Sequence, residues 1–133
     1  MPTSGMGTDM SAEFRQLVAD ICTPLPGAEV SDPWGGGHNA WKVGGKMFAS
    51  IGAVNPGVSV KCADIESSQL LQEAGVATKA PYFHRSWAHF AEDTNRQELK
   101  ARIETSYDLI RSKLPAMVRK ELPERIAAEN EVA

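Results

Sequence analysis

Two adjacent glycines near the middle of the chain, Gly44 and Gly45, constrain the fold more than any other feature. They separate two short segments rich in apolar residues, Asn39–Val43 and Lys46–Val54. Paired glycines readily adopt the left-handed backbone that a two-residue turn needs. The pattern therefore predicts an antiparallel hairpin.

A tight turn also fixes which side chains of the hairpin face one another. Because side chains alternate along a strand, one set points to the core and the other set points away from it. We expect Trp41 and Phe48 in the core. The predicted cross-strand pairs are Val43 with Lys46, Lys42 with Met47, and Trp41 with Phe48.

Further strands are expected on both sides of the hairpin. Ala28–Val30 is a short apolar segment before it. Val58–Cys62 alternates apolar with polar residues, which is typical of a half-buried strand. Trp87–Phe90 ends an aromatic and basic segment and is the last strand that the sequence predicts.

Helices are predicted where apolar residues recur at three and four positions. Asp64 caps one helix, and Thr94 with Gln97 forms a capping box for another. The predicted helices cover Ser11–Cys22, Ile65–Ala74, a long segment from Thr94 to Pro115, and Ala116–Leu122. Their expected apolar contacts are Phe14, Leu17, Val18 and Ile21 in the first, Leu70, Leu71 and Ala74 in the second, and Leu99, Ile103, Tyr107, Ile110 and Leu114 in the third.

The order of these elements predicts an α+β fold. We expect an antiparallel sheet of about four or five strands with helices packed on one face. A chain of 133 residues has the length of one domain. We expect a flexible leader over residues 1–10, a single domain over 11–122 and a polar tail over 123–133.

Composition narrows the class of protein. No apolar stretch is long enough to cross a membrane, and the N-terminal residues lack the basic and apolar regions of a signal peptide. Cys22 and Cys62 match no zinc or redox spacing, so we expect two reduced, buried thiols. These features predict a cytoplasmic protein without a membrane partner.

Charge argues against strong binding to nucleic acid, because the isoelectric point is near 5.6. The middle of the chain, residues 38–90, nevertheless carries five Lys and Arg against three Asp and Glu. Such cations can contact phosphates weakly, in a salt-sensitive manner. Alternatively, they keep a sheet face soluble and block its edges. The candidate DNA-binding residues are Lys42, Lys46, Lys61, Lys79 and Arg85.

Aromatic residues suggest a second kind of site. Trp87 is the tryptophan that we expect at a surface pocket, because aromatic, histidine and arginine residues surround it in sequence. The candidate pocket residues are Tyr82, His84 and Trp87. The tryptophans that can stack on bases or anchor the core are Trp34, Trp41 and Trp87.

Signatures of metal binding and catalysis are weak. No carboxylate is evidently paired with the three histidines, so we expect no metal site and no cofactor. Gly35–Gly37 lacks the residues of a phosphate-binding loop. No nucleophile–base pair is visible, and Cys62 falls on the buried side of its strand. The sequence therefore predicts a protein that is not an enzyme.

Several short motifs follow one another between Phe14 and Leu122. They are Leu25-Pro-Gly, Trp41-Lys-Val-Gly-Gly-Lys-Met-Phe48, Val60-Lys-Cys62, Trp87, Ser106-Tyr107 and Lys113-Leu-Pro115. In this order they resemble the MmcQ/YjbR family. The resemblance implies a two-layer sandwich related to the frataxin-like (CyaY-like) fold, and DNA binding through a "double wing" arrangement.

Two functions of different class follow. The first is weak, non-catalytic DNA binding through the hairpin tip and the basic sheet face. The alternative is a protein-interaction or small-ligand module with a pocket near Trp87.

Overall fold

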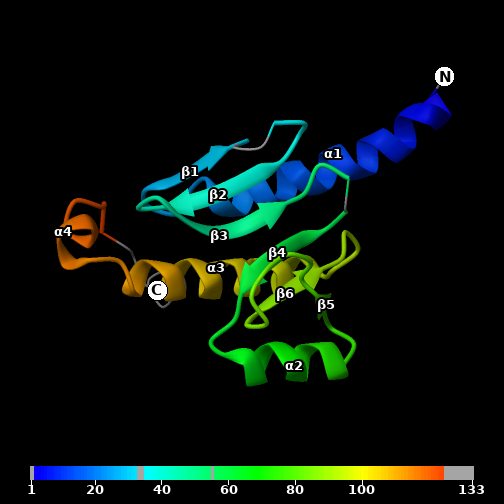
Figure 1. Cartoon of the computed structure of the whole chain (residues 1–133). Coiled ribbons are helices and arrows are strands. Elements are labelled where there is room, and N and C mark those ends of the chain that lie inside the picture. The colour runs from blue at the N-terminus through cyan, green and yellow to red at the C-terminus, as the bar shows by residue number, and fades with distance from the viewer. Residues whose placement is uncertain (1, 33–34, 55, 125–133) are drawn as a thin grey trace.

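The computed structural model describes residues 2–32, 35–54 and 56–124, with the backbone alone for residues 2–11. The described residues form four helices and six strands, which are arranged as in Figure 1. Their bounds are α1 Pro2–Cys22, β1 Ala28–Ser31, β2 Asn39–Val43, β3 Lys46–Ile51, β4 Val58–Lys61, α2 Ile65–Glu73, β5 Thr78–Lys79, β6 Trp87–Phe90, α3 Arg96–Ser112 and α4 Ala116–Arg119. None of the described helices has the length and apolarity that crossing a bilayer requires.

The α+β fold is confirmed, with one strand more than expected. All strand pairs are antiparallel, and the sheet order is β1-β2-β3-β4-β6-β5. The unpredicted strand is β5, whose two residues pair with β6 at the edge. Two residues are too few for an alternating pattern to be recognised in sequence.

The central hairpin forms where it is predicted, but its register differs at one position. Gly44 and Gly45 both have positive φ, and the pairs nearest the turn are those expected. Trp41, however, faces Ala49 rather than Phe48, because a β-bulge follows. The bulge turns two consecutive residues of β3, Phe48 and Ala49, into the core.

One face of the sheet is covered by α1 and α3 (Figure 1). On α3, Leu99, Ile103 and Tyr107 are buried as predicted, and Ile110 is only partly buried. Leu114 is buried too, but it follows the end of the helix at Ser112. Tyr107 meets Phe48 edge to face at 5.3 Å. Ser106, also buried, donates to the carbonyl of Phe48 and accepts from the amide of Lys61. This single hydroxyl joins β3 and β4 where their own pairing has ended.

The second helix, α2, does not lie on that layer but beside β5 and β6, as Figure 1 shows. Its cap at Asp64 is confirmed. Of its expected apolar contacts, Leu71 packs against the core, whereas Leu70 is 62% exposed and Ala74 is exposed too. Ser68 is buried instead, and its hydroxyl donates to the carbonyl of Trp87.

Other helix ends also differ from expectation. α1 begins at Pro2, not at Ser11, since proline suits the first helical turn, where no donor is needed. α3 is capped by Asn95 instead of Thr94, whose hydroxyl donates back to the carbonyl of Ala91. α4 ends at Arg119. The expected limits of the domain, 11 and 122, stay predictions.

Candidate ligand-binding site

The face of the sheet opposite α1 and α3 carries a row of small and polar side chains. The register aligns Ser50 of β3 with Ser59 of β4, and Ser59 with His89 of β6. Their strand neighbours point the other way into the core, because side chains alternate. Short side chains leave this open face hollow in its middle.

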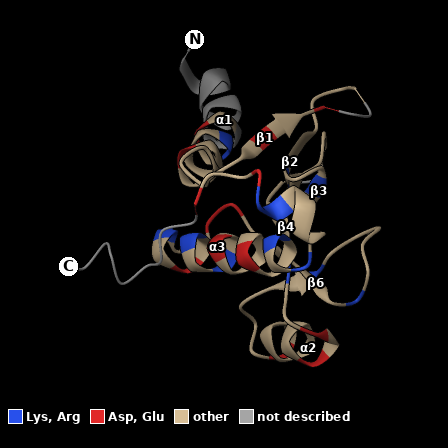
Figure 2. Cartoon of the chain, turned by 90° about the vertical axis from the view of Figure 1, so that its left-hand side faces the viewer, with Lys and Arg blue, Asp and Glu red and all other residues tan. Residues whose placement is uncertain are grey.

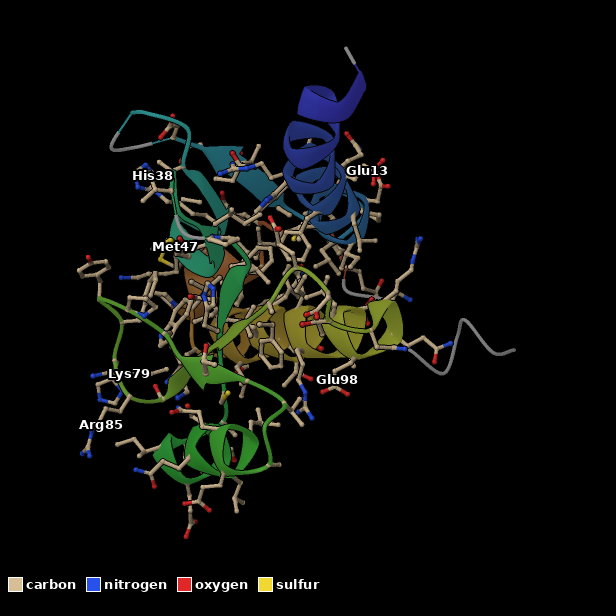
Figure 3. The ribbon with its side chains drawn as sticks, turned by 90° about the vertical axis from the view of Figure 1, so that its right-hand side faces the viewer. Glu13, His38, Met47, Lys79, Arg85 and Glu98 are labelled. Carbon is tan, nitrogen blue, oxygen red and sulfur yellow. The ribbon has the colours of Figure 1, made fainter. Side chains whose placement is uncertain are left out.

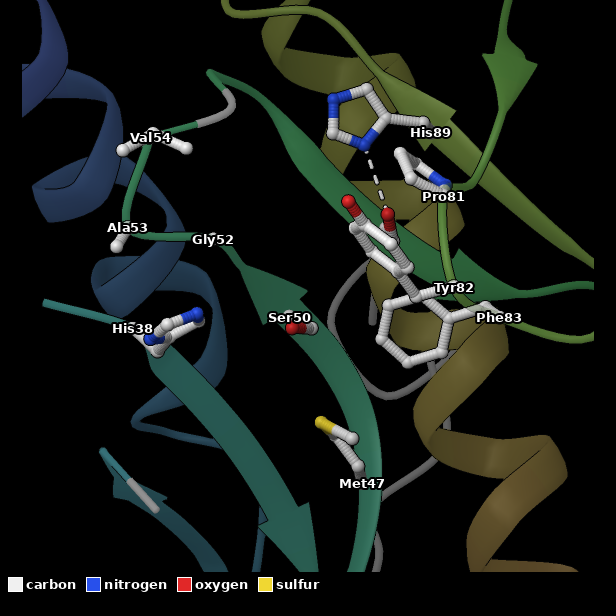
Figure 4. A pocket seen from close by; sticks show the side chains of 11 residues that line it. His38, Met47, Ser50, Gly52, Ala53, Val54, Pro81, Tyr82, Phe83 and His89 are labelled. Atoms are coloured by element: carbon white, nitrogen blue, oxygen red, sulfur yellow. Dashed lines mark hydrogen bonds between the residues drawn. The ribbon is translucent and has the colours of Figure 1, made fainter. Parts of the chain in front are cut away.

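A cavity of about 680 Å³ lies over this row (Figure 4). Its floor comes from the strands, and its walls come from the β3–β4 loop and the segment before β6. Pockets that bind small molecules have this size. The lining residues are His38, Met47, Ser50, Gly52, Ala53, Val54, Ser59, Pro81, Tyr82, Phe83 and His89.

His89 is held at both ring nitrogens. Its Nε2 lies 2.7 Å from the carbonyl oxygen of Pro56, which can only accept, so Nε2 carries the proton. In the neutral ring, Nδ1 then accepts from the hydroxyl of Ser59 at 2.9 Å, the contact drawn in Figure 4. These two bonds fix the imidazole as part of the wall.

Ser50 offers the cavity a hydroxyl that bonds to none of the described residues. Its side chain is 7% exposed and faces the hollow, and no partner for its hydroxyl occurs in the described part of the chain. None of the described residues that line the cavity is Lys, Arg, Asp or Glu. The site therefore suits an uncharged group with a polar edge.

Two exposed apolar residues stand at the rim. Tyr82 is 99% exposed and has a φ of 68°, a backbone conformation that non-glycine residues rarely adopt. Val54 is 88% exposed on the opposite loop. Backbone strain of the kind found at Tyr82 often marks a functional position.

The pocket residues predicted from the sequence divide between two places. Tyr82 lines the cavity, whereas Trp87 lies behind its wall, with Phe83 stacked on it at 4.4 Å and an angle of 16°. His84 points to the hydroxyl of Ser86 and is not part of the lining. The indole of Trp87 thus supports the cavity wall through its stacking with Phe83.

The five predicted DNA-binding cations do not form one patch. Figure 3 places Lys79 and Arg85 on the same side of the molecule as Met47, and Glu13 and Glu98 on the other. Lys42 faces Met47 across the hairpin and belongs to the open face. Figure 2 shows that α3 carries both signs of charge.

The other two cations occupy different positions. Lys46 is exposed at the hairpin tip, at the end of β3 away from the cavity. Lys61 is half-buried, and its ammonium donates to Ser86 rather than pointing to solvent. Trp34 lies outside the described residues.

The described residues offer neither a cluster of metal ligands nor a reactive thiol. Among the described residues, no three His, Cys, Asp or Glu side chains gather as metal ligands. Cys22 and Cys62 are free and buried, as predicted. Burial raises the pKa of both thiols, which keeps them protonated and unreactive.

A family model named YjbR matches residues 23–109, well over half of the chain. The chain belongs to the YjbR family. Its fold is similar to the crystal structure of a DUF419-domain protein of Deinococcus radiodurans, DR2400, with a TM-score of 0.72 and 22% identity. The similarity covers 84% of this chain and 90% of that one. No curated protein matches the chain.

The YjbR family resemblance is therefore confirmed, whereas the cavity was missed by sequence reasoning. The alternation around Ser59 indicated that this residue points away from the core. Its alignment with Ser50 and His89 depends on the strand order, which no local pattern contains. His38 and Val54 lie in loops and gave no signal.

Proposed function

We propose that this YjbR-family chain is a non-catalytic binding protein whose open-face cavity takes an uncharged aromatic ring of a small organic ligand. The observation that carries this proposal is a cavity of small-molecule size on the sheet face that none of the described helices covers. The YjbR family is not known as catalytic.

The lining supports a planar, uncharged group. Met47, Phe83 and Pro81 offer apolar surface, and a thioether makes favourable contacts with aromatic rings. The hydroxyl of Ser50 at the floor can bond to a polar ring edge. A charged ligand would lose its hydration without gaining an ion pair here.

Thermal melting with added probes tests this function. Anything that binds only the folded state raises the melting temperature. We expect indole and adenosine to raise it, whereas benzoate and cyclohexanol have little effect. A chain that responds to none of the four probes would contradict the proposal.

A filled cavity provides the control. Ala53 is exposed and lines the cavity, so Ala53→Trp should block it without disturbing the core. Ala101 is exposed on α3, and Ala101→Trp adds the same bulk elsewhere. We expect the response to indole to disappear in the first variant only. An equal response in both would place binding outside the cavity.

DNA binding is a second candidate, favoured by the cations that share the cavity's side of the molecule. Lys42, Lys79 and Arg85 could contact phosphates while Tyr82 stacks on a base. Three contacts predict weak binding, with a salt slope of about −0.7 per contact on single strands and about −0.9 on duplex DNA.

Fluorescence anisotropy with labelled single-stranded and duplex DNA, at low and physiological salt, tests this candidate. We expect Lys79→Glu combined with Arg85→Glu to abolish binding. Arg119 and Lys120 are exposed at the end of α4, so Arg119→Glu combined with Lys120→Glu is the matched control. Equal losses in both variants would reveal a general charge effect and not a surface.

A further inference from the structure

Two buried serines at the floor of the open-face cavity differ in how their hydroxyls are used. Ser50 of β3 and Ser59 of β4 face one another across the strand pair, and both line the cavity. Only 7% of Ser50 and 3% of Ser59 is exposed. Directly opposed residues of antiparallel strands have Cβ atoms about 4.5–5.5 Å apart. One small ring can therefore contact both hydroxyls.

His89 determines what the Ser59 hydroxyl can still offer to a ligand. Nε2 of His89 donates to the carbonyl of Pro56 at 2.7 Å, so Nδ1 of the neutral ring is an acceptor. The Ser59 hydroxyl therefore gives its only proton to Nδ1, at 2.9 Å. Its oxygen is left as an acceptor, and it can bind a ligand only through a donor that the ligand supplies.

The loop between β3 and β4 is shaped to hold His89 in this state. Gly57 has a φ of 99°, and a Cβ at this position would lie 2.6 Å from Nε2 of His89 and overlap the carbonyl oxygen of Phe90. A side chain there would push the loop away from the imidazole and separate the Pro56 carbonyl from Nε2. The glycine thus permits the contact that fixes the direction of the Ser59 hydroxyl.

The hydroxyl of Ser50 is available for the other half of a ligand's polar edge. It bonds to none of the described residues, and it faces the hollow beside Ser59 (Figure 4). A hydroxyl donates one hydrogen bond, and leaving that bond unmade in a buried position costs free energy. A ligand that places an acceptor on Ser50 removes this cost. The two serines thus present an acceptor next to a donor.

We propose that the cavity selects small nitrogen heterocycles whose edge carries an N–H donor next to an acceptor, as in a cyclic amide. The N–H of the ligand donates to the oxygen of Ser59, and its carbonyl accepts from the hydroxyl of Ser50. Adenosine carries the same pattern in its amino group and the neighbouring ring nitrogen. This inference rests on the proposed function of the cavity, and it adds which ring edge the cavity recognises.

Two probes of the same shape differ at the one atom that would meet Ser59. Carbostyril has an N–H beside its carbonyl, and coumarin has a ring oxygen in that place, which the acceptor on Ser59 repels. We expect isothermal titration calorimetry at pH 8 to give carbostyril an affinity about tenfold higher than that of coumarin. If indole binds and coumarin binds as tightly as carbostyril, this inference is overturned while the proposed function stands. If neither indole nor carbostyril binds, both are overturned.

Alanine variants assign each contact to its hydroxyl. Ser59→Ala removes the group that distinguishes N–H from ring oxygen, so we expect the preference for carbostyril over coumarin to fall towards one. Ser50→Ala removes the donor to the carbonyl that both probes carry, so both affinities should fall several-fold and the preference should remain. Ser112→Ala, exposed on α3, is the control and should change neither affinity. An unchanged preference in Ser59→Ala, or unchanged affinities in Ser50→Ala, with the fold checked by circular dichroism, would overturn the assignment.

Discussion

The two faces of the sheet are built from the same strands, but they differ in the side chains they carry and in whether helices cover them. On the helix-covered face, Phe48, Val60 and Phe90 are fully buried beneath α1 and α3. On the open face, the alternate positions hold Ser50, Ser59 and His89. Alternation along a strand thus lets one face form the core while the other lines a cavity.

The difference has a thermodynamic basis. Burying a Phe or Val side chain contributes roughly 1.5–3 kcal/mol, whereas burying a serine contributes little beyond its hydrogen bond. Substitutions on the open face should therefore lower the free energy of unfolding only slightly. The helix-covered face cannot, because its side chains interlock with α3.

Truncating neighbouring residues of β3 should show the largest contrast. Phe48 faces α3, and Met47 faces the cavity. We expect Phe48→Ala to lower the free energy of unfolding by about 3–5 kcal/mol. Met47→Ala should lower it by about 1 kcal/mol. Urea denaturation measures both, and similar losses would show that the open face also carries the fold.

Removing the Ser106 hydroxyl should have the next largest effect. It bonds to the Phe48 carbonyl at 2.6 Å and to the Lys61 amide at 2.9 Å, in a fully buried position. Ser106→Ala leaves both backbone groups without a partner, which costs about 2 kcal/mol. Urea denaturation gives the loss, and hydrogen exchange at the Lys61 amide should accelerate. Wild-type protection of that amide would contradict this role.

Local signals in the sequence predicted most of the fold. The Gly44–Gly45 turn, the strand Trp87–Phe90 and the Asp64 cap depend on neighbouring residues alone, and all three are confirmed. The errors arose where tertiary packing decides. The bulge moved the partner of Trp41, and α2 turned Leu70 outward because Ser68 bonds to β6.

The candidate site was less predictable, because it depends on strands that are not neighbours in sequence. β4 pairs with β6 across α2 and β5, and this pairing alone aligns Ser59 with His89. The same pairing brings Lys61 to Ser86. Sequence reasoning assigned Lys61 and His84 to different surfaces, because no local pattern indicated that Ser86 bonds to both.

A serine-to-alanine substitution on the open face should have the smallest effect on the free energy of unfolding. Ser59→Ala removes the hydroxyl that bonds to Nδ1 of His89, but Nε2 still donates to Pro56. Water in the cavity can replace the lost partner, so we expect a loss of about 1 kcal/mol or less, below that of Ser106→Ala. Urea denaturation compares the two variants, and NMR of the imidazole nitrogens shows whether His89 keeps its proton on Nε2. A loss equal to that of Ser106→Ala would mean that the His89 wall is part of the folding core. The open face could then not be free to accommodate a ligand.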